Sequence, residues 1–278
     1  MEERKVAIVT GASRGLGAVF ARVLAEEGYA VALGARDREG IERLAAGLPA
    51  AFAHPLDVGD PGSVAAFRDA VLSRFGRVDA LVNNAGIGIF KRLEDFSAEE
   101  MERTFRVNVQ GVWAVTTAFL PQLKASSGQV FMVSSDVSTR TFPTGGPYTA
   151  SKFALRALAR TLQQENPELR VLELRPGATD TSFAGSTPGA PGKEWFLRPD
   201  TVAETVRFAL RLPPEARVEE IVIRSSSQTP ESLSESMPPP CHDRREDRMD
   251  LTGPGLGSGS GVPSEETARR PRGLRKVS

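Results

Sequence analysis

A tyrosine and a lysine four residues apart have the clearest chemical use in this sequence. Tyr148 and Lys152 lie at positions i and i+4, so in a helix their side chains share one face. A free tyrosine has a pKa near ~10 and is a poor base at neutral pH, but a neighbouring positive charge favours its phenolate. Lys152 would supply that charge. The pair therefore predicts a site where Tyr148 passes a proton to or from a substrate oxygen.

A glycine-rich turn near the N-terminus predicts a second site. An apolar strand runs into Thr10-Gly11-Ala12-Ser13-Arg14-Gly15-Leu16-Gly17, which opens an amphipathic segment. Glycine allows a sharp turn and lets a phosphate approach bare backbone, and the N–H groups at a helix start attract anions. The turn therefore indicates a dinucleotide site, although its glycine spacing differs from the G-x-G-x-x-G fingerprint.

The elements that must position these residues alternate along the chain. Seven short apolar runs predict strands, and longer amphipathic stretches predict helices between them. Such alternation indicates βαβ units and a parallel sheet. The predicted strands are 6–9, 30–33, 51–53, 80–82, 130–133, 171–174 and 221–223, and the predicted helices are 16–27, 62–75, 99–123, 147–166 and 199–210.

These motifs resemble those of the short-chain dehydrogenase/reductase family in its single-domain form. The glycine turn matches the family's T-G-x-x-x-G-x-G motif, and Tyr148 and Lys152 match its Y-x-x-x-K motif. The resemblance covers about residues 5 to 224. It implies an oxidoreductase with a doubly wound α/β Rossmann fold, whose seven-stranded parallel sheet carries helices on both faces.

The resemblance also implies roles for residues around the tyrosine. Ser135, thirteen residues before Tyr148, matches the serine that holds the substrate oxygen, and Ser134 is the alternative. Asn108 matches the helix asparagine that supports a water molecule linked to Lys152. The lysine is further expected to bond the nicotinamide ribose. The expected catalytic set is therefore Asn108, Ser135, Tyr148 and Lys152.

The cofactor is expected to touch several separate segments. By resemblance, Asp57 and Val58 meet the adenine ring, and the N-N-A-G motif at 83–86 lets the adenosine ribose lie close to the backbone. Thr179 and Thr181 are expected to position the carboxamide of the nicotinamide. No metal site is expected. The full expected cofactor set is Gly11, Ser13, Arg14, Gly15, Leu16, Gly17, Arg36, Asp57, Val58, Asn84, Ala85, Gly86, Tyr148, Lys152, Pro176, Gly177, Thr179 and Thr181.

Two arginines favour NADP(H) over NAD. Where the family's NAD enzymes carry an acid, this sequence has Ala35 followed by Arg36, and Arg14 lies in the glycine turn. Guanidinium groups pair with a 2′-phosphate, whereas a carboxylate holds a free 2′-hydroxyl and repels phosphate. The alternative is that Arg36 is an ordinary surface residue and that Asp37 holds the hydroxyl.

Three functions are compatible with these motifs. The first is NADP(H)-dependent hydride transfer between the nicotinamide and a ketone or aldehyde–alcohol pair, with a small-molecule substrate. The second is reduction of a 3-oxoacyl thioester, which the family also contains. The third is a non-catalytic NADP(H) sensor, against which the complete catalytic set argues.

The loop after the sixth strand is expected to close over the substrate. The segment 182–195 is rich in glycine and proline, which favours mobility. Phe90, Phe183 and Trp195 are candidate walls of the substrate pocket.

Composition narrows the partners and the compartment. The 35 basic and 35 acidic residues cancel, so neither nucleic acid nor an anionic membrane is expected as a partner. The single cysteine, Cys241, has no disulfide partner, and no apolar run reaches the ~18 residues of a membrane span. No signal peptide is recognised before the first strand. These features predict a cytoplasmic protein, and the family implies a homodimer or homotetramer.

The chain is expected to divide near residue 226. Residues 1–226 form the predicted Rossmann domain, and the Ser/Pro/Gly/Arg-rich stretch 227–278 is the expected disordered tail. Its basic cluster at 269–276 is a solvated tail or, alternatively, binds an anionic surface.

Overall fold

Seven strands form one parallel sheet in the computed structural model, which describes residues 4–227. The strand order is β3-β2-β1-β4-β5-β6-β7, so the prediction of a seven-stranded parallel sheet is confirmed. All of the expected tail except its first residue lies outside the described residues, as does Cys241. The strands are β1 (Val6–Thr10), β2 (Ala30–Ala35), β3 (Ala51–Pro55), β4 (Ala80–Asn83), β5 (Gln129–Val133), β6 (Arg170–Pro176) and β7 (Glu220–Ile223).

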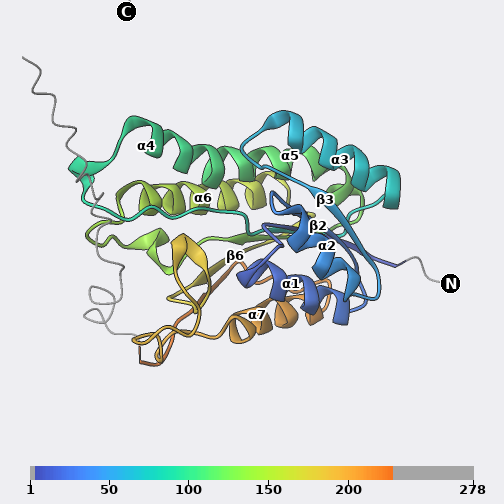
Figure 1. Ribbon diagram of the computed structural model, residues 1–278. Coiled ribbons are helices and arrows are strands. Elements are labelled where there is room, and N and C mark those ends of the chain that lie inside the picture. The colour runs from blue at the N-terminus through green and yellow to red at the C-terminus, as the bar shows by residue number, and fades with distance from the viewer. Residues whose placement is uncertain (1–3, 228–278) are drawn as a thin grey trace, which may run out of the picture. The chain divides into compact units, whose positions relative to one another are not determined.

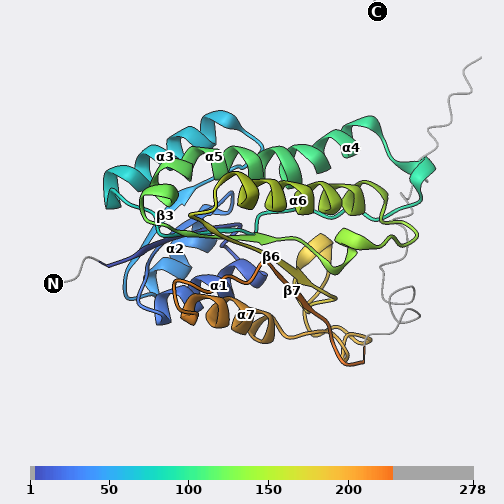
Figure 2. The same ribbon diagram turned by 180° about the vertical axis from the view of Figure 1, so that it is seen from behind.

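Helices cover both faces of this sheet, as the doubly wound prediction requires (Figures 1 and 2). One layer contains α1 (Gly15–Glu26), α2 (Arg38–Ala46) and α7 (Pro199–Arg211). The other contains α3 (Pro61–Phe75), α4 (Ala98–Phe105), α5 (Gly111–Ala125) and α6 (Gly146–Glu165). Each layer closes its own apolar core against the sheet, one around Phe20 and Leu24 and the other around Phe67 and Phe119.

The central strands are apolar because both of their faces are covered. Every residue of β1, β2, β4 and β5 is buried. A strand covered on both sides needs a continuous apolar run rather than an alternating one. This explains why short runs such as 6–9 and 130–133 identified the strands correctly.

Helix α2 was missing from the prediction. Ile41, Leu44 and Ala45 have helical spacing, but the helix is only nine residues long, four of them charged, and only Gly40 and Ile41 are buried. Its apolar stripe is therefore short. The start signal is Asp37, whose carboxylate accepts a hydrogen bond of 3.0 Å from the N–H of Gly40 as a helix cap.

The expected helix over 99–123 differs from the structure in one respect. A π-helical turn, η2 (Arg106–Gln110), separates α4 from α5. Such a turn inserts one residue into a helix and leaves only a weak mark on apolar periodicity. The turn carries Asn108.

The fold brings the predicted motifs to one edge of the sheet. The carboxyl ends of β1, β4, β5 and β6 lead into the glycine turn, the N-N-A-G motif, Ser135 and the Pro176–Thr181 segment. β1 lies between β2 and β4, so successive strands are added on one side of β1 up to β3 and on its other side from β4 onward. In open sheets of this kind, ligands bind in the crevice at the carboxyl ends of the strands where the order reverses. Within residues 4–227 no helix combines the length and apolar character needed to cross a bilayer.

Candidate active site

The glycine turn between β1 and α1 depends on backbone freedom at two positions and on close packing at a third. Gly11 and Gly15 have φ values of +65° and +56°, a conformation that side-chain-bearing residues rarely adopt. A Cβ atom on Gly17 would lie 2.2 Å from the carbonyl oxygen of Gly11. The turn can therefore pack α1 tightly against the end of β1 only with glycine at these sites.

Asn84 and Thr10 fix the turn to the neighbouring strand β4. The side-chain amide of Asn84 donates to the carbonyl oxygens of Thr10 (3.0 Å) and Gly11 (3.2 Å). The Thr10 hydroxyl in turn accepts the N–H groups of Asn84 and Ala85, each at 3.0 Å. The polar atoms of this motif thus hold the two loops side by side.

The start of α1 is suited to an anion. Its N-cap residue, Arg14, makes no side-chain capping bond, so the first N–H groups of the helix have no side-chain cap. Arg14 and Arg36 are exposed, border the adjoining cavity and have no ion-pair partner within residues 4–227. Asp37 is already engaged as the cap of α2. Two available guanidinium groups therefore stand at this end of the cavity.

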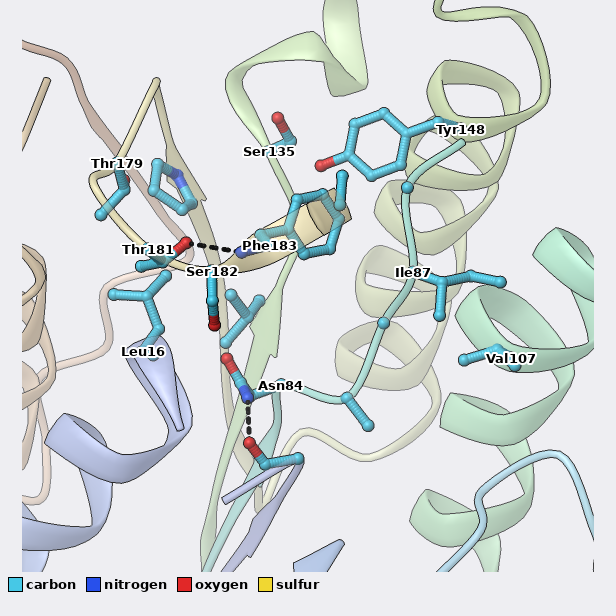
Figure 3. Close-up of a pocket in the computed structure, with 18 of the residues that line it drawn as sticks. Leu16, Asn84, Ile87, Val107, Ser135, Tyr148, Thr179, Thr181, Ser182 and Phe183 are labelled. Carbon is cyan, nitrogen blue, oxygen red and sulfur yellow. Dashed lines mark hydrogen bonds between the residues drawn. The ribbon is translucent and has the colours of Figure 1, made fainter. Parts of the chain in front are cut away.

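One cavity of about 940 Å³ joins the glycine turn to the tyrosine. Figure 3 shows Leu16 and Thr181 on one wall, with Tyr148 and Ile87 on the opposite wall. Of the expected cofactor residues, all except Gly17 border this cavity, whereas Gly17 is buried beneath the turn. The volume is within the range of cofactor and ligand sites.

Tyr148, Ser135 and Lys152 meet at the inner end of the cavity. Tyr148 and Lys152 come from α6, and Ser135 follows β5; Figure 3 shows the tyrosine hydroxyl pointing toward Ser135. The Lys152 ammonium lies 5.6 Å from the centre of the tyrosine ring and donates a 3.0 Å hydrogen bond to the carbonyl oxygen of Val133. The alternative, Ser134, also borders the cavity, and its buried hydroxyl has no hydrogen-bond partner in the described part of the chain.

Burial controls the protonation of both α6 residues. It raises the pKa of Tyr148 to about 12; the nearby Ser135 hydroxyl lowers this pKa, and the charge of Asp136 raises it. Burial lowers the pKa of Lys152 to about 8, although the carboxylate of Glu173 acts in the opposite direction. Burial thus raises the pKa of Tyr148, whereas Lys152 was expected to lower it.

Asn108 is placed behind the cavity rather than on its wall. The π-helical turn directs its side chain at the main chain of Ile87, which donates to the amide oxygen (2.8 Å) and accepts from the amide nitrogen (2.9 Å). The same nitrogen donates to the Ser151 hydroxyl at 3.0 Å, and that hydroxyl donates to the carbonyl oxygen of Tyr148 at 2.6 Å. Asn108 thus connects the loop after β4 to the helix that carries the tyrosine. Sequence reasoning missed Ser151, although it immediately precedes Lys152.

Three phenylalanines form the wall beside Tyr148. The rings of Phe90 and Phe183 lie 5.3 and 5.7 Å from the tyrosine ring, and Phe142 lies 5.9 Å from Phe90. Phe90 and Phe183 border the cavity, as predicted. Sequence reasoning missed Phe142, which also borders the cavity. Its ring packs against the backbone at Gly145, where a Cβ would lie 2.4 Å from the ring.

The expectation for Trp195 is wrong. The cavity is bordered instead by the next residue, Phe196, whose ring lies 4.6 Å from that of Trp195. Asp180, which lies just before the segment 182–195, holds part of it: its carboxylate accepts from the N–H of Gly189 at 2.9 Å and pairs with Lys193 at 3.4 Å.

Across residues 4–227, no group of three or more metal-binding side chains comes together.

Known proteins with this arrangement were found by sequence and by structure. Residues 5–190 match the family model described as short chain dehydrogenase. An uncharacterized oxidoreductase of Staphylococcus saprophyticus is 31% identical over 239 residues, covering 81% of this chain and 97% of its own length. Glycine betaine reductase ATRR of Emericella nidulans is 36% identical over 234 residues, covering 79% of this chain, but the chain spans only 18% of that protein.

Solved structures agree with these relatives. An alcohol dehydrogenase from the archaeon Thermococcus sibiricus, complexed with 5-hydroxy-NADP, is 50% identical with a TM-score of 0.79, covering 82% of this chain and 99% of its own. A 3-ketoacyl-(acyl-carrier-protein) reductase from Brucella melitensis, complexed with NADH, is 32% identical with a TM-score of 0.73, covering 80% of this chain and 97% of its own. The chain therefore belongs to the short-chain dehydrogenase family and is an oxidoreductase with a Rossmann fold.

Proposed function

We propose that the protein transfers a hydride between NADP(H) and a small ketone or aldehyde–alcohol pair, with Tyr148 as the proton donor and acceptor. The observation that carries this proposal is the single cavity that runs from the uncapped start of α1 to the Tyr148 hydroxyl. One end suits a dinucleotide, and the other presents two hydroxyls, those of Tyr148 and Ser135, to a substrate oxygen.

The residues around the cavity fit a dinucleotide phosphate. The glycine turn and the first N–H groups of α1 would hold the pyrophosphate, and Arg14 and Arg36 would pair with a 2′-phosphate. Asp57 and Val58 would meet the adenine, and Thr179 and Thr181 would position the nicotinamide; all four border the cavity. When bound, the nicotinamide supplies or accepts the hydride.

The chain's own contribution is to orient the substrate oxygen and to move one proton. The Ser135 hydroxyl would donate a hydrogen bond to the carbonyl oxygen, which stabilises the negative charge that develops there. The Tyr148 hydroxyl would give its proton to the same oxygen during reduction. Burial raises the pKa of this phenol, which favours the protonated form that carbonyl reduction needs. Lys152 would hold its positive charge near the tyrosine and the nicotinamide ribose.

The phenylalanine wall favours a carbonyl with an apolar substituent. Phe90, Phe142 and Phe183 lie next to the tyrosine, and burying a substrate's apolar surface against them would stabilise binding. The 50% identity to an alcohol dehydrogenase supports a carbonyl–alcohol pair as the substrate. A second candidate, reduction of a 3-oxoacyl thioester, is favoured by the likeness to the Brucella reductase.

The test is consumption of NADPH or NADH with diketones, aldehydes and 3-oxoacyl esters, by the full chain and by its Tyr148→Phe variant. We expect turnover of a ketone or aldehyde with NADPH and a loss of at least ~100-fold in kcat for the variant, since general acid–base catalysis contributes about that much. Cofactor binding without turnover of any substrate would favour a sensor. Preferred turnover of the 3-oxoacyl esters would favour the second candidate.

A further inference from the structure

Arg175 is a buried arginine behind the catalytic end of the cavity. It lies near the end of β6, directly before Pro176, and only 4% of its surface is exposed. The preceding residue, Leu174, packs in the apolar core on the opposite face of the sheet, and Glu173, on the same face as Arg175, is also buried. A charge in such a place is costly unless it is well paired. The guanidinium group of Arg175 therefore needs partners that offset the cost of its burial.

The guanidinium contacts the segment that begins with Ser135. Its Nε donates to the carbonyl oxygen of Ser135 at 3.4 Å, and one Nη donates to the carbonyl oxygen of Asp136 at 3.3 Å. The same Nη donates to the Thr139 hydroxyl, and the other Nη pairs with the Glu220 carboxylate of β7. One side chain thus bonds to three residues of a five-residue segment and is itself held by the last strand.

The segment 135–139 has little regular structure of its own to hold it. It consists of Ser135 and the single 3₁₀ turn η3 (Asp136–Thr139), and within it the N–H of Ser138 donates to the Ser135 carbonyl at 3.0 Å. Short 3₁₀ turns have poor hydrogen-bond geometry. An external donor that binds two consecutive carbonyls restricts the rotation of both peptide groups. Within the segment, the Ser135 hydroxyl also caps the turn by accepting a hydrogen bond from the N–H of Val137 at 3.3 Å. The hydroxyl therefore moves with the turn, and the position of the turn depends in part on the contact from outside the segment.

A second set of charges connects this segment to α6. Glu220 also pairs with Arg156 at 2.8 Å, and Arg156 lies one helical turn beyond Lys152. Arg156 pairs in addition with the buried Glu173 at 2.8 Å, and Glu173 accepts a 2.9 Å hydrogen bond from the Ser138 hydroxyl. The two carboxylates thus join the serine segment and the tyrosine helix through one charged cluster.

We propose that Arg175 is a positioning residue for the reaction: by holding the carbonyls of Ser135 and Asp136, it fixes the Ser135 hydroxyl opposite Tyr148. This inference rests on the proposed function, in which Ser135 orients the substrate oxygen. Small displacements of a catalytic group can cost about 100-fold in rate. Loss of Arg175 should therefore slow the chemical step while leaving the glycine turn intact, because that turn follows β1, which β4 and β5 separate from β6.

A double-mutant cycle tests whether Arg175 acts through Ser135. The full chain is compared with Ser135→Ala, Arg175→Met and the double variant, with kcat, KM and the affinity for NADPH measured for each. We expect Arg175→Met to lower kcat roughly 10- to 100-fold in the native background. In the Ser135→Ala background the same change should cost less than about 3-fold, because residues that act as a unit are not additive. The affinity for NADPH should stay within about 3-fold throughout.

A matched control separates positioning from general loss of an ion pair. Arg160 of α6 pairs with the same carboxylate, that of Glu220, at 3.5 Å but is exposed. Arg160→Met should therefore leave kcat unchanged. If Arg175→Met does not fold, Arg175→Lys replaces it in the cycle; it keeps a charged donor group but loses the planar fork, and should show a smaller loss with the same pattern. Equal fold losses in both serine backgrounds, or no loss, would overturn the inference alone. A native rate in Ser135→Ala would overturn the proposed role of Ser135 and the inference with it.

Discussion

The ammonium group of Lys152 reaches from α6 to the end of β5, where it donates a 3.0 Å hydrogen bond to the carbonyl oxygen of Val133. The ammonium group thus belongs to a buried residue, of which only 6% is exposed. Burial lowers the pKa of Lys152 to about 8. Its charge is therefore partly lost at a pH at which most lysines remain fully protonated.

Carbonyl reduction should weaken as the pH rises through about 8. Lys152 loses its charge there, whereas the pKa of Tyr148 is raised by burial to about 12, so the tyrosine stays protonated. The Glu173 carboxylate raises the pKa of Lys152, so Glu173→Gln should move the fall in kcat/KM to lower pH. The measurement is kcat/KM against pH for both proteins, with folding checked by circular dichroism. An unshifted profile in a folded variant would contradict the assignment to Lys152.

The burial of Lys152 should also make stability depend on pH. Its pKa in the folded protein, about 8, lies below its ordinary value. Between these two values the unfolded chain binds more protons than the folded one, so folding becomes more favourable as pH rises. The cost of burying the charge is fully present below pH 8. Lys152→Met should thus improve stability more at pH 7 than at pH 10, as measured by urea unfolding. The opposite trend would show that the lysine charge stabilises the fold.

Arg36 should control the choice between NADPH and NADH. Replacing it with aspartate removes a partner for the 2′-phosphate and adds a repelling charge. Hydrogen bonds to charged groups contribute about 1.5–3 kcal/mol, so the preference for NADPH should fall roughly 10- to 100-fold. Arg38→Asp is the control, since Arg38 is exposed nearby but pairs with Glu42 at 2.7 Å and does not border the cavity. Equal use of both cofactors by the native protein would refute the prediction.

Phe183 should affect binding of bulky substrates more than the chemical step. Its ring lies 5.7 Å from that of Tyr148 and is partly exposed to the cavity. Removing part of an apolar wall costs on the order of 1 kcal/mol in binding. Phe183→Ala should thus raise KM about 5-fold for an aryl ketone and change it little for a small aldehyde. Phe208→Ala, on the exposed face of α7, is the control; a similar KM change there would mean that the loss is not local.

The sequence was informative wherever chemistry depends on neighbours along the chain. The glycine turn and the Tyr148–Lys152 spacing both act within a single turn or helix, so their patterns are visible in one dimension. Arg175 was invisible because its partners, Ser135 and Glu220, lie 40 and 45 positions away. The direction of the Tyr148 pKa shift could not be predicted either, since it depends on burial by several segments. Trp195 was mistaken for its neighbour because a loop has no periodicity that fixes which side chain faces inward.

The π-helical turn at Arg106–Gln110 implies an unusual response to shortening the chain. Removing one residue from this turn would let α4 and α5 merge into one regular α-helix, which is the more favourable backbone geometry. Each residue of such a helix advances about 100° around its axis, so the deletion would turn Asn108 away from Ile87 or turn the whole of α4 against α6. The irregular turn thus lets Asn108 face Ile87 while α4 faces α6. A more regular helix would lose one of these two contacts.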